Sequence, residues 1–238
     1  KVGLIALSTD QTIEGDFNTI CKNLPLDIFV NRIHNQNPLT KENLLKMEKD
    51  LESVTNKILP EEKINTIAYG CTSGTAAIGE TEVNAKIQAA QPGIPCTNPI
   101  AAASAALQAF GARKISVLTP YTDSVNIELA ERFCERGFQI LNIDGFGMED
   151  DIEMTRLPLV SISEGAMQVC DPNADALFIS CTAIRAAAVA QDLESRLRKP
   201  VVTSNQALAW HCLRLLNDDF SVSGYGSLFE LGPNGSPL

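Results

Sequence analysis

Two segments of the chain share one pattern: TIAYGCTSGTAA at residues 66–77 and ALFISCTAIRAA at residues 176–187. In each, an apolar run predicts a buried strand, and small or hydroxyl-bearing residues predict a turn that leads into an Ala-rich helix. Cys71 and Cys181 stand at the same place, at the end of the predicted strand and directly before a threonine. Ligands of open α/β sheets bind beyond this end of the strands. We therefore expect one cysteine from each half of a duplicated fold to face a shared cleft.

The chain alternates short apolar segments with longer segments of helical periodicity. Strands separated by helices are typical of parallel sheets built from βαβ units, so the predicted fold class is α/β. Residues 224–238, with their glycines and prolines, predict irregular structure. Strands are predicted at 2–7, 28–31, 66–69, 94–96, 115–119, 138–143, 176–179 and 201–203. Helices are predicted at 43–58, 76–90, 100–110, 124–136, 163–170, 183–198 and 206–216.

The duplication extends beyond the cysteines. VGLIALSTD (2–10) aligns with ISVLTPYTD (115–123), and TN (97–98) aligns with SN (204–205). The offset between the paired segments drifts slowly along the chain, as in a duplicated half-chain with small deletions. Chance similarity of short apolar strands is the alternative, but the matches are colinear and keep polar residues in register.

Two pseudo-symmetric, Rossmann-like (flavodoxin-like) domains with parallel sheets follow from this duplication, with the active site expected in the cleft between them. The first domain is predicted to comprise residues 1–95, with residues 206–238 packing back onto it. The second is predicted to comprise residues 96–205.

Composition narrows the function classes. The net charge is −10, from 19 basic and 29 acidic side chains, which disfavours binding to nucleic acid. No apolar run approaches the length of a membrane span. Seven scattered cysteines without a Cys-x-x-Cys pair fit a reducing cytoplasm better than a disulfide framework. His34 and His211 have no cluster of ligand residues beside them in the sequence, so no metal site is predicted.

The two repeated cysteines are the predicted catalytic residues. A thiol reacts as its thiolate, and its pKa falls at a helix N-terminus, where backbone N–H groups stabilise the anion. If Cys71 and Cys181 face each other, they could act as acid and base on opposite sides of a planar intermediate. The alternative is a small buried apolar residue, the fate of most free cysteines. That alternative is expected for Cys21, Cys134, Cys170 and Cys212, whereas Cys96 is left open, with packing favoured.

Hydroxyl groups surround both cysteines in the sequence. Thr72, Ser73 and Thr75 follow the first cysteine, and Thr182 follows the second. Together with backbone N–H groups they form a donor-rich turn suited to a carboxylate or an enediolate. The alternative is N-capping of the following helix, and both roles are compatible. No G-x-G-x-x-G or Gly-Lys-Ser/Thr fingerprint of a nucleotide site occurs there.

Polar residues also end the two aligned strands at 2–7 and 115–119. The hydroxyl of Tyr121 could bind a carboxylate, with Thr122 beside it; a half-buried aromatic side chain is the alternative. Asp10 could bind a cationic group of a substrate or tune a nearby thiol; the alternative is a turn or helix cap. The acidic run at 149–153 is expected to be a solvated surface.

Three of these motifs resemble a known superfamily. GCTSG (70–74), SCT (180–182) and YT (121–122) resemble the aspartate/glutamate racemases. Within that superfamily the chain looks most like the branch that holds maleate cis-trans isomerase, arylmalonate decarboxylase and the ectoine-utilisation proteins. The resemblance covers essentially the whole chain. It implies a two-domain α/β protein with pseudo-twofold symmetry that uses no cofactor and no metal.

The resemblance also implies roles for individual residues. Cys71 would be the nucleophile or base of the first half and Cys181 its counterpart in the second. Thr72, Ser73 and Tyr121 would hold a substrate carboxylate. The decarboxylases keep only the second-half thiol, whereas racemases and maleate isomerases have both. The presence of both thiols therefore disfavours decarboxylation.

The chain departs from the maleate isomerases at two places. It reads Ser8-Thr9-Asp10 where they show Ser-Ser-Asn, and Asp150-Asp151 where they show Asp-Asn. An asparagine can donate a hydrogen bond to a carboxylate, and an ionised aspartate cannot. Asp10 and Asp151 are therefore predicted to contact a substrate other than maleate. An amino or amidine group beside Asp10 favours an amino-acid-like or ectoine-like substrate.

The sequence thus predicts a cofactor-independent isomerase or racemase of a small carboxylic acid, either a dicarboxylate or an amino-acid-like molecule. One alternative is an arylmalonate-type decarboxylase. Another is a non-catalytic small-molecule-binding protein of an ectoine-type degradation pathway. The expected partner is the small carboxylate itself, and the Ala-rich helices leave room for a homodimer interface.

Overall fold

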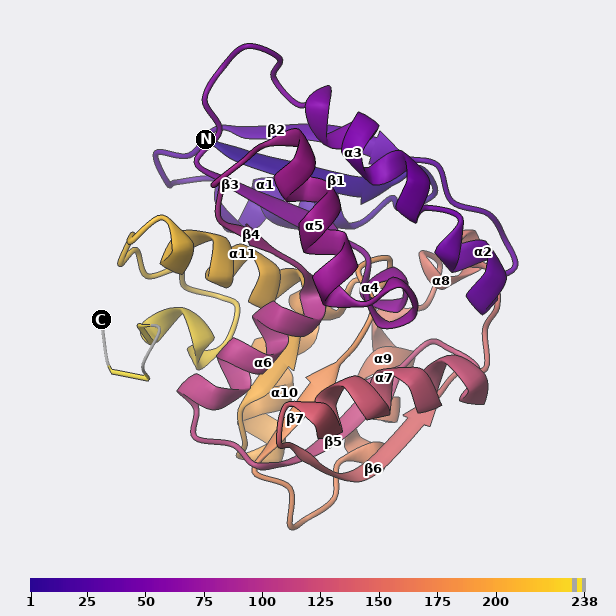
Figure 1. Cartoon of the computed structure of the whole chain (residues 1–238). Coiled ribbons are helices and arrows are strands. Elements are labelled where there is room, and N and C mark those ends of the chain that lie inside the picture. Colours follow the sequence, from indigo (N-terminus) through magenta and orange to yellow (C-terminus); the bar gives the residue numbers. More distant parts are fainter. Residues whose placement is uncertain (233–234, 237–238) are drawn as a thin grey trace.

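Two parallel sheets form the frame of the molecule (Figure 1). The computed structural model describes residues 1–232 and 235–236 of the 238-residue chain. The first sheet has the strand order β2-β1-β3-β4. Its strands are β1 (Val2–Leu7), β2 (Ile28–Ile33), β3 (Thr66–Gly70) and β4 (Cys96–Thr97).

The second sheet repeats the arrangement of the first. Its order is β6-β5-β7-β8, so β5 takes the place of β1 and β7 the place of β3. All of its pairings are parallel, like those of the first sheet. The predicted α/β fold with two parallel sheets is therefore confirmed. The strands are β5 (Lys114–Thr119), β6 (Gln139–Gly145), β7 (Ala176–Ile179) and β8 (Val201–Thr203).

Helices connect the strands and cover the sheets. The first half contains α1 (Ile13–Ile20), α2 (Lys41–Leu45), α3 (Glu48–Asn56), α4 (Thr72–Ile78) and α5 (Glu80–Ala90). The later part contains α6 (Pro99–Ala109), α7 (Asp123–Glu135), α8 (Asp151–Met154), α9 (Leu159–Val169), α10 (Ala190–Leu197) and α11 (Ser204–Leu215). Two 3₁₀ helices are η1 (Ala186–Val189) and η2 (Ser227–Glu230).

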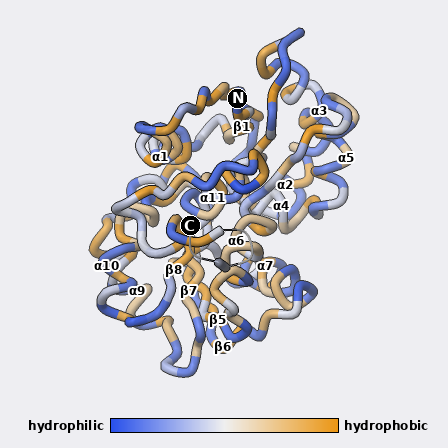
Figure 2. The backbone as a smooth tube through the Cα atoms, turned by 90° about the vertical axis from the view of Figure 1, so that its left-hand side faces the viewer, coloured by the Kyte–Doolittle hydropathy of each residue, from blue (hydrophilic) through white to orange (hydrophobic). Residues whose placement is uncertain are grey.

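The central strands form because they are apolar over their full length. Every residue of β1 is buried, and so is every residue of β7. Strands that helices cover on both faces carry such continuous apolar runs. Figure 2 shows hydrophobic residues along β7 and β8, with hydrophilic stretches at the surface of the molecule. Within the described residues, no helix is both long and apolar enough to span a membrane.

Two segments that were each predicted as one helix are each divided into two helices. The helix predicted at 43–58 is two helices, α2 and α3, which are separated by a turn at residues 46–47. The helix predicted at 76–90 starts earlier, at Thr72, and breaks at Gly79. Gly79 has a φ of 91°, a conformation that glycine adopts without strain and that ends a helix.

Other elements differ from the sequence expectation. The strand predicted at 94–96 is shifted to β4, because Ile94 lies in a turn whose N–H bonds the Gln91 carbonyl (3.4 Å). Helix α1 was missed, although Ile13, Phe17 and Ile20 form its buried face. Residues 224–238, predicted as irregular, include η2, whose Leu228 and Phe229 are fully buried.

Helix α11 lies at the junction of the two halves. It contacts α1 and β3 on one side and α6 on the other. Its N-terminus is held by a capping box between Thr203 and Gln206, and the indole N–H of Trp210 bonds the Leu231 carbonyl (2.9 Å). These contacts tie the C-terminal segment to the body of the protein. The domain boundary at 95/96 stays a prediction.

Candidate active site

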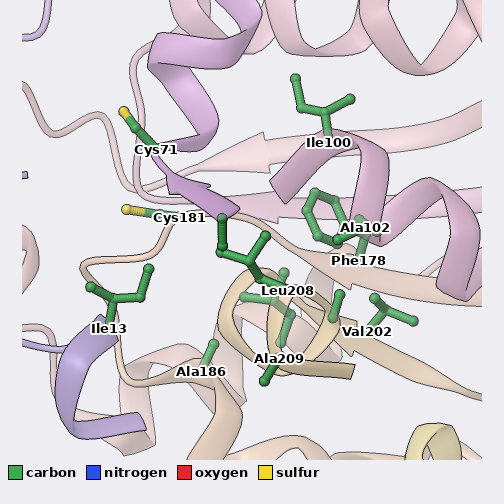
Figure 3. Packing of buried hydrophobic residues seen from close by; sticks show 14 of the residues in the cluster. Ile13, Cys71, Ile100, Ala102, Phe178, Cys181, Ala186, Val202, Leu208 and Ala209 are labelled. Carbon is green, nitrogen blue, oxygen red and sulfur yellow. The ribbon is translucent and has the colours of Figure 1, made fainter. Parts of the chain in front are cut away.

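The two repeated cysteines lie close together at the strand ends of the two sheets. Cys71 directly follows β3, and Cys181 follows β7 by one residue. Figure 3 shows both side chains projecting their sulfurs to the same side. Both are buried, with 2% and 4% of their surface exposed. Burial raises the pKa of Tyr121 well above its usual value, and the charges of Cys181 and Cys71 raise it further.

Cys71 is the N-cap of α4. Its backbone is extended (φ −147°), and its Sγ accepts a hydrogen bond from the Gly74 N–H at 3.1 Å. The Ser73 hydroxyl lies 3.7 Å from the same sulfur. The hydroxyl of Thr75 donates to the Cys71 carbonyl at 2.7 Å. The turn therefore aims polar hydrogens at the first sulfur, as the sequence predicted for this segment.

Gly74 makes room for a side chain that the sequence did not single out. A Cβ at position 74 would lie 2.5 Å from the Tyr69 hydroxyl oxygen and 2.8 Å from the Cys71 sulfur. The Tyr69 hydroxyl donates to the Met47 sulfur at 3.8 Å, and it lies close enough to Cys71 to lower the pKa of that thiol. The missing side chain at position 74 therefore leaves space for the Tyr69 hydroxyl beside Cys71. The apolar strand pattern around Tyr69 hid its polar end.

The backbone conformation at Cys181 differs from that at Cys71. Cys181 has a φ of 92°, a left-handed conformation that costs free energy for a residue with a Cβ. Its Sγ accepts from the Ala183 N–H at 3.4 Å. The chain then bends, and helical structure begins only with η1, so the helix predicted at 183–198 is wrong at its start. Cys181 therefore does not directly precede a helix N-terminus, contrary to the expectation from the sequence.

Burial keeps both thiols neutral in the ligand-free protein. It raises the pKa of Cys71 to about 12 and that of Cys181 further, and the Asp151 carboxylate adds to both shifts. Hydrogen bonds from Gly74 and Ser73 to Cys71, and from Tyr121 to Cys181, act in the opposite direction. The expectation that a helix N-terminus lowers these pKa values is wrong here, because desolvation of the thiolate is the larger effect.

Asp10 reaches the same site from the end of β1. It is 2% exposed, and its Oδ1 accepts the N–H groups of Thr12 (2.7 Å) and Ile13 (2.9 Å). Its charge is close enough to Cys181 to raise the pKa of that thiol. Asp10 therefore forms the turn before α1 and also lies beside the second cysteine. Its predicted role as a turn residue and its predicted effect on a nearby thiol are thus compatible.

Asp151 lies against both thiols from the start of α8. Its Oδ2 accepts hydrogen bonds from the Thr9 hydroxyl (3.1 Å) and the Asn35 amide (2.9 Å). Burial raises its pKa to about 6. The expectation of a solvated acidic run is wrong for Asp151, which is 3% exposed while Asp150 caps α8 beside it. Asn35 lies in an unpatterned polar loop and was not predicted.

The other predicted binding residues divide into two groups. The Thr182 hydroxyl donates to the Gly70 carbonyl (3.2 Å), and the Thr72 hydroxyl pairs with that of Ser204 (3.2 Å), so both link segments around the site. Thr122 is different: its hydroxyl pairs with Ser124 (3.1 Å) on an exposed turn. No group of three or more His, Cys, Asp or Glu within the described ranges is arranged to hold a metal ion.

Two like α/β halves, each ending a strand with a buried cysteine, define a class of pseudo-symmetric proteins with paired thiols. The family model described as arylmalonate decarboxylase matches residues 74–229, which is more than half of the chain. The chain belongs to the arylmalonate decarboxylase family. The predicted branch, which also holds maleate isomerase, is thereby confirmed.

Two relatives place the chain within this branch. The chain is 28% identical to arylmalonate decarboxylase of Bordetella bronchiseptica over 141 residues, or 58% of this chain; the match spans 59% of the length of that enzyme. It is 22% identical to maleate isomerase of Geobacillus stearothermophilus over 244 residues, which cover 97% of both chains.

Solved structures share the whole fold. A cysteine-to-alanine mutant of the Pseudomonas putida S16 maleate isomerase with maleate has a TM-score of 0.88 at 19% identity, over 100% of this chain and 98% of that one. A Nocardia farcinica maleate isomerase mutant with a covalently bound succinylcysteine intermediate also scores 0.88, at 20% identity over 96% and 97%. A liganded arylmalonate decarboxylase mutant scores 0.87, at 22% identity over 96% and 98%.

Proposed function

We propose that this protein is a cofactor-independent isomerase or racemase that acts on a small carboxylic acid through Cys71 and Cys181. The observation that carries the proposal is the convergence of two buried thiols, one from each half, around the hydroxyl of Tyr121. Thiols can serve as base, acid or nucleophile, so a pair can act on both faces of one bound molecule.

In the proton-exchange form of the reaction, one thiolate takes the proton from the carbon next to the substrate carboxylate. That carbon then carries the electron pair as a planar enediolate, and the other thiol returns a proton to the opposite face. The thiolate that takes the proton ends as a thiol, and the thiol that returns a proton ends as a thiolate. For a substrate with a double bond, the thiolate would instead add to one carbon of that bond. The former double bond would then be single and could rotate, and elimination of the thiolate would restore the double bond.

Hydrogen-bond donors around the thiols suit the charge that develops. The hydroxyls of Tyr121 and Ser73 lie beside the sulfurs and can donate to an enediolate oxygen. Because burial disfavours a lone thiolate, a thiol has to ionise as the substrate binds rather than before it. A buried site of this kind strengthens each hydrogen bond to the developing charge.

Membership of the arylmalonate decarboxylase family supports a second candidate, decarboxylation of a malonate. Such an enzyme releases CO₂ and then protonates the carbanion once, so one thiol suffices. The second buried thiol, Cys71, favours the two-sided reaction.

The test is proton NMR in deuterated water with a panel of small diacids, amino acids and ectoine derivatives. We expect deuterium to appear at the α-carbon of the substrate. Cys71→Ser and Cys181→Ser should each lower the rate by at least about 100-fold, since each removes one acid–base group. Cys134→Ser, which changes an exposed cysteine, is the matched control and should leave the rate unchanged.

Three results would decide against the proposal. Full turnover by both single cysteine variants would show that the thiols are not the reacting groups. Release of CO₂ from malonates without isomerisation of any acid would identify a decarboxylase. Tight binding of an acid with neither exchange nor product would identify a non-catalytic binding protein.

A further inference from the structure

One oxygen atom in the site lacks a hydrogen-bond partner. The carboxylate of Asp10 uses Oδ1 to accept the N–H groups of Thr12 and Ile13, while its Oδ2 is buried and accepts no hydrogen bond from the described residues. A buried polar atom without a partner costs roughly 1–3 kcal/mol, and more when it is charged. Such an atom calls for an explanation, and a ligand group is the usual one at a functional site.

The free oxygen lies at the junction that carries Cys181. The hydroxyl of Thr12 donates to the Ala183 carbonyl at 2.6 Å, which fixes the Asp10 turn against the turn of the second cysteine. The Thr182 hydroxyl lies close enough to the Asp10 carboxylate to lower its pKa as a hydrogen-bond donor, but its geometry fits a bond to the Gly70 carbonyl (3.2 Å) instead. The Asp10 carboxylate therefore lies at the turn that carries the second cysteine, and its charge acts on the Cys181 thiol.

The basic side chain nearest to Asp10 is already engaged. Arg32 donates from Nη1 to the Leu7 and Asp10 backbone carbonyls (2.9 and 2.7 Å) and from Nη2 to Glu14 (2.7 Å). It does not bond the Asp10 side chain. Asp151, the other carboxylate of the site, differs from Asp10 because Thr9 and Asn35 occupy its Oδ2.

We infer that the substrate carries a protonated nitrogen, and that this ammonium group donates its hydrogen bond to Oδ2 of Asp10. The inference rests on the proposed function and names its substrate class: small amino acids rather than plain dicarboxylates. The substrate cation supplies the donor that the fold omits. It also places a positive charge beside two carboxylates, where a dianion would meet like charge from Asp10 and Asp151.

The same cation helps the chemistry. The charges that most raise the pKa of Cys181, after burial, are the carboxylates of Asp151 and Asp10. An ammonium group between them offsets those charges and favours the thiolate. A dicarboxylate would have the opposite effect on the thiol.

A neutral, protonated Asp10 would bind a different group of the substrate. Burial raises the pKa of Asp10, and a protonated Oδ2 would donate to a substrate carboxylate instead of accepting from an ammonium. Asp10→Asn separates the two cases. The asparagine keeps the carbonyl oxygen for Thr12 and Ile13, and it presents a donor, as the protonated acid would, but it cannot pair with a cation.

The experiment measures the rise in Tm of the full chain with matched pairs of ligands: 2-aminobutyrate against butyrate, aspartate against succinate, and β- and γ-amino acids against their deamino analogues. We expect amino acids to raise the Tm of the wild-type protein and their deamino partners to have little effect. Asp10→Asn should weaken amino-acid binding at least about tenfold, the loss expected for a hydrogen bond between charged groups. It should improve binding of succinate.

Asp16→Asn is the matched control. It removes another partly buried carboxylate near Asp10, but one that already accepts a hydrogen bond from Asn205 (2.8 Å), and it should leave ligand preference unchanged. The inference is overturned if succinate and butyrate bind the wild-type protein as well as their amino partners. It is also overturned if no amino acid binds, or if Asp10→Asn binds amino acids with unchanged affinity.

The failure of this inference and that of the proposed function are distinguishable. Isomerisation of a plain dicarboxylate through both cysteines would refute the ammonium site and retain the enzyme. Amino-acid binding that depends on Asp10, without deuterium exchange, would retain the ammonium site and refute the enzyme.

Discussion

The backbone at Cys181 carries strain that its counterpart lacks. With φ at 92°, a residue with a Cβ is destabilised relative to glycine, whereas Cys71 has an ordinary extended φ. We expect Cys181→Gly to be more stable to urea than Cys181→Ala by about 1 kcal/mol. Both variants lack the thiol, so the comparison isolates the backbone.

The same pair of substitutions at Cys71 is the control. There glycine relieves nothing and adds flexibility to the unfolded chain, so Cys71→Gly should be no more stable than Cys71→Ala. If Cys181→Gly is as unstable as Cys181→Ala, the turn at the second cysteine is unstrained.

The absence of a side chain at Gly74 allows the Tyr69 hydroxyl and the Cys71 sulfur to lie where they do. A Cβ there would overlap the Tyr69 hydroxyl and the Cys71 sulfur. We expect Gly74→Ala to lower the free energy of unfolding by about 1–3 kcal/mol, the usual cost of overpacking, and to abolish turnover. Gly15→Ala on α1 is the control, because its Cβ would meet open space. Equal stability and activity of the two variants would contradict this packing.

At the scale of residues, the local sequence pattern predicted the two cysteines of the site. The residues that reach them through tertiary contacts could not be predicted in this way. Cys71 and Cys181 stood out because duplication repeated them. Tyr69 did not, because its ring belongs to a buried strand and only its hydroxyl reaches the sulfur. Asn35 bonds Asp151 from 116 positions away, a contact that no local pattern encodes.

Helices α1 and α11 meet through a hydrogen bond between charged and neutral partners. The Asn205 amide on α11 donates to Asp16 on α1 at 2.8 Å. Burial raises the pKa of Asp16 from 3.8 to about 6. A carboxyl with a raised pKa binds its proton more tightly in the folded chain, so its contribution to stability falls as pH rises from about 4 to about 6 and stays lower above that.

We therefore expect Asp16→Asn to stabilise the protein at pH 7, by roughly 1–3 kcal/mol, and to have less effect at pH 4.5. The new side chain can still accept from Asn205. Urea unfolding of both proteins across this pH range measures the difference. A difference that does not grow between pH 4.5 and 7 would mean that Asp16 is not desolvated at this helix junction.

At the scale of elements, the sequence predicted the central strands with almost correct bounds, because β1 and β7 are continuous apolar runs. It failed where tertiary packing overrides periodicity. A helix of eight residues such as α1 offers only three buried positions to detect, and the bend after Cys181 depends on a backbone angle that composition does not reveal.

At the scale of the whole molecule, the site is closed by contacts between the halves. Thr12 bonds Ala183, Thr182 bonds Gly70, and the Leu39 N–H bonds the Glu149 carbonyl (2.8 Å) beside the Asn35–Asp151 pair. The duplication in the sequence predicted two similar halves with parallel sheets. It could not predict these contacts, because each joins residues of the two halves that lie far apart in the sequence.

The central claim is that Cys71 and Cys181 serve one substrate site, and mutually exclusive alkylation tests it most directly. The protein used keeps these two cysteines and replaces the other five by alanine; forms with either cysteine alone show how fast each reacts with N-ethylmaleimide. Intact mass spectrometry then counts adducts per native chain. We predict one adduct per chain, because the first fills the space between the sulfurs. Two adducts, the second forming as fast as in the single-cysteine protein, would contradict a shared site.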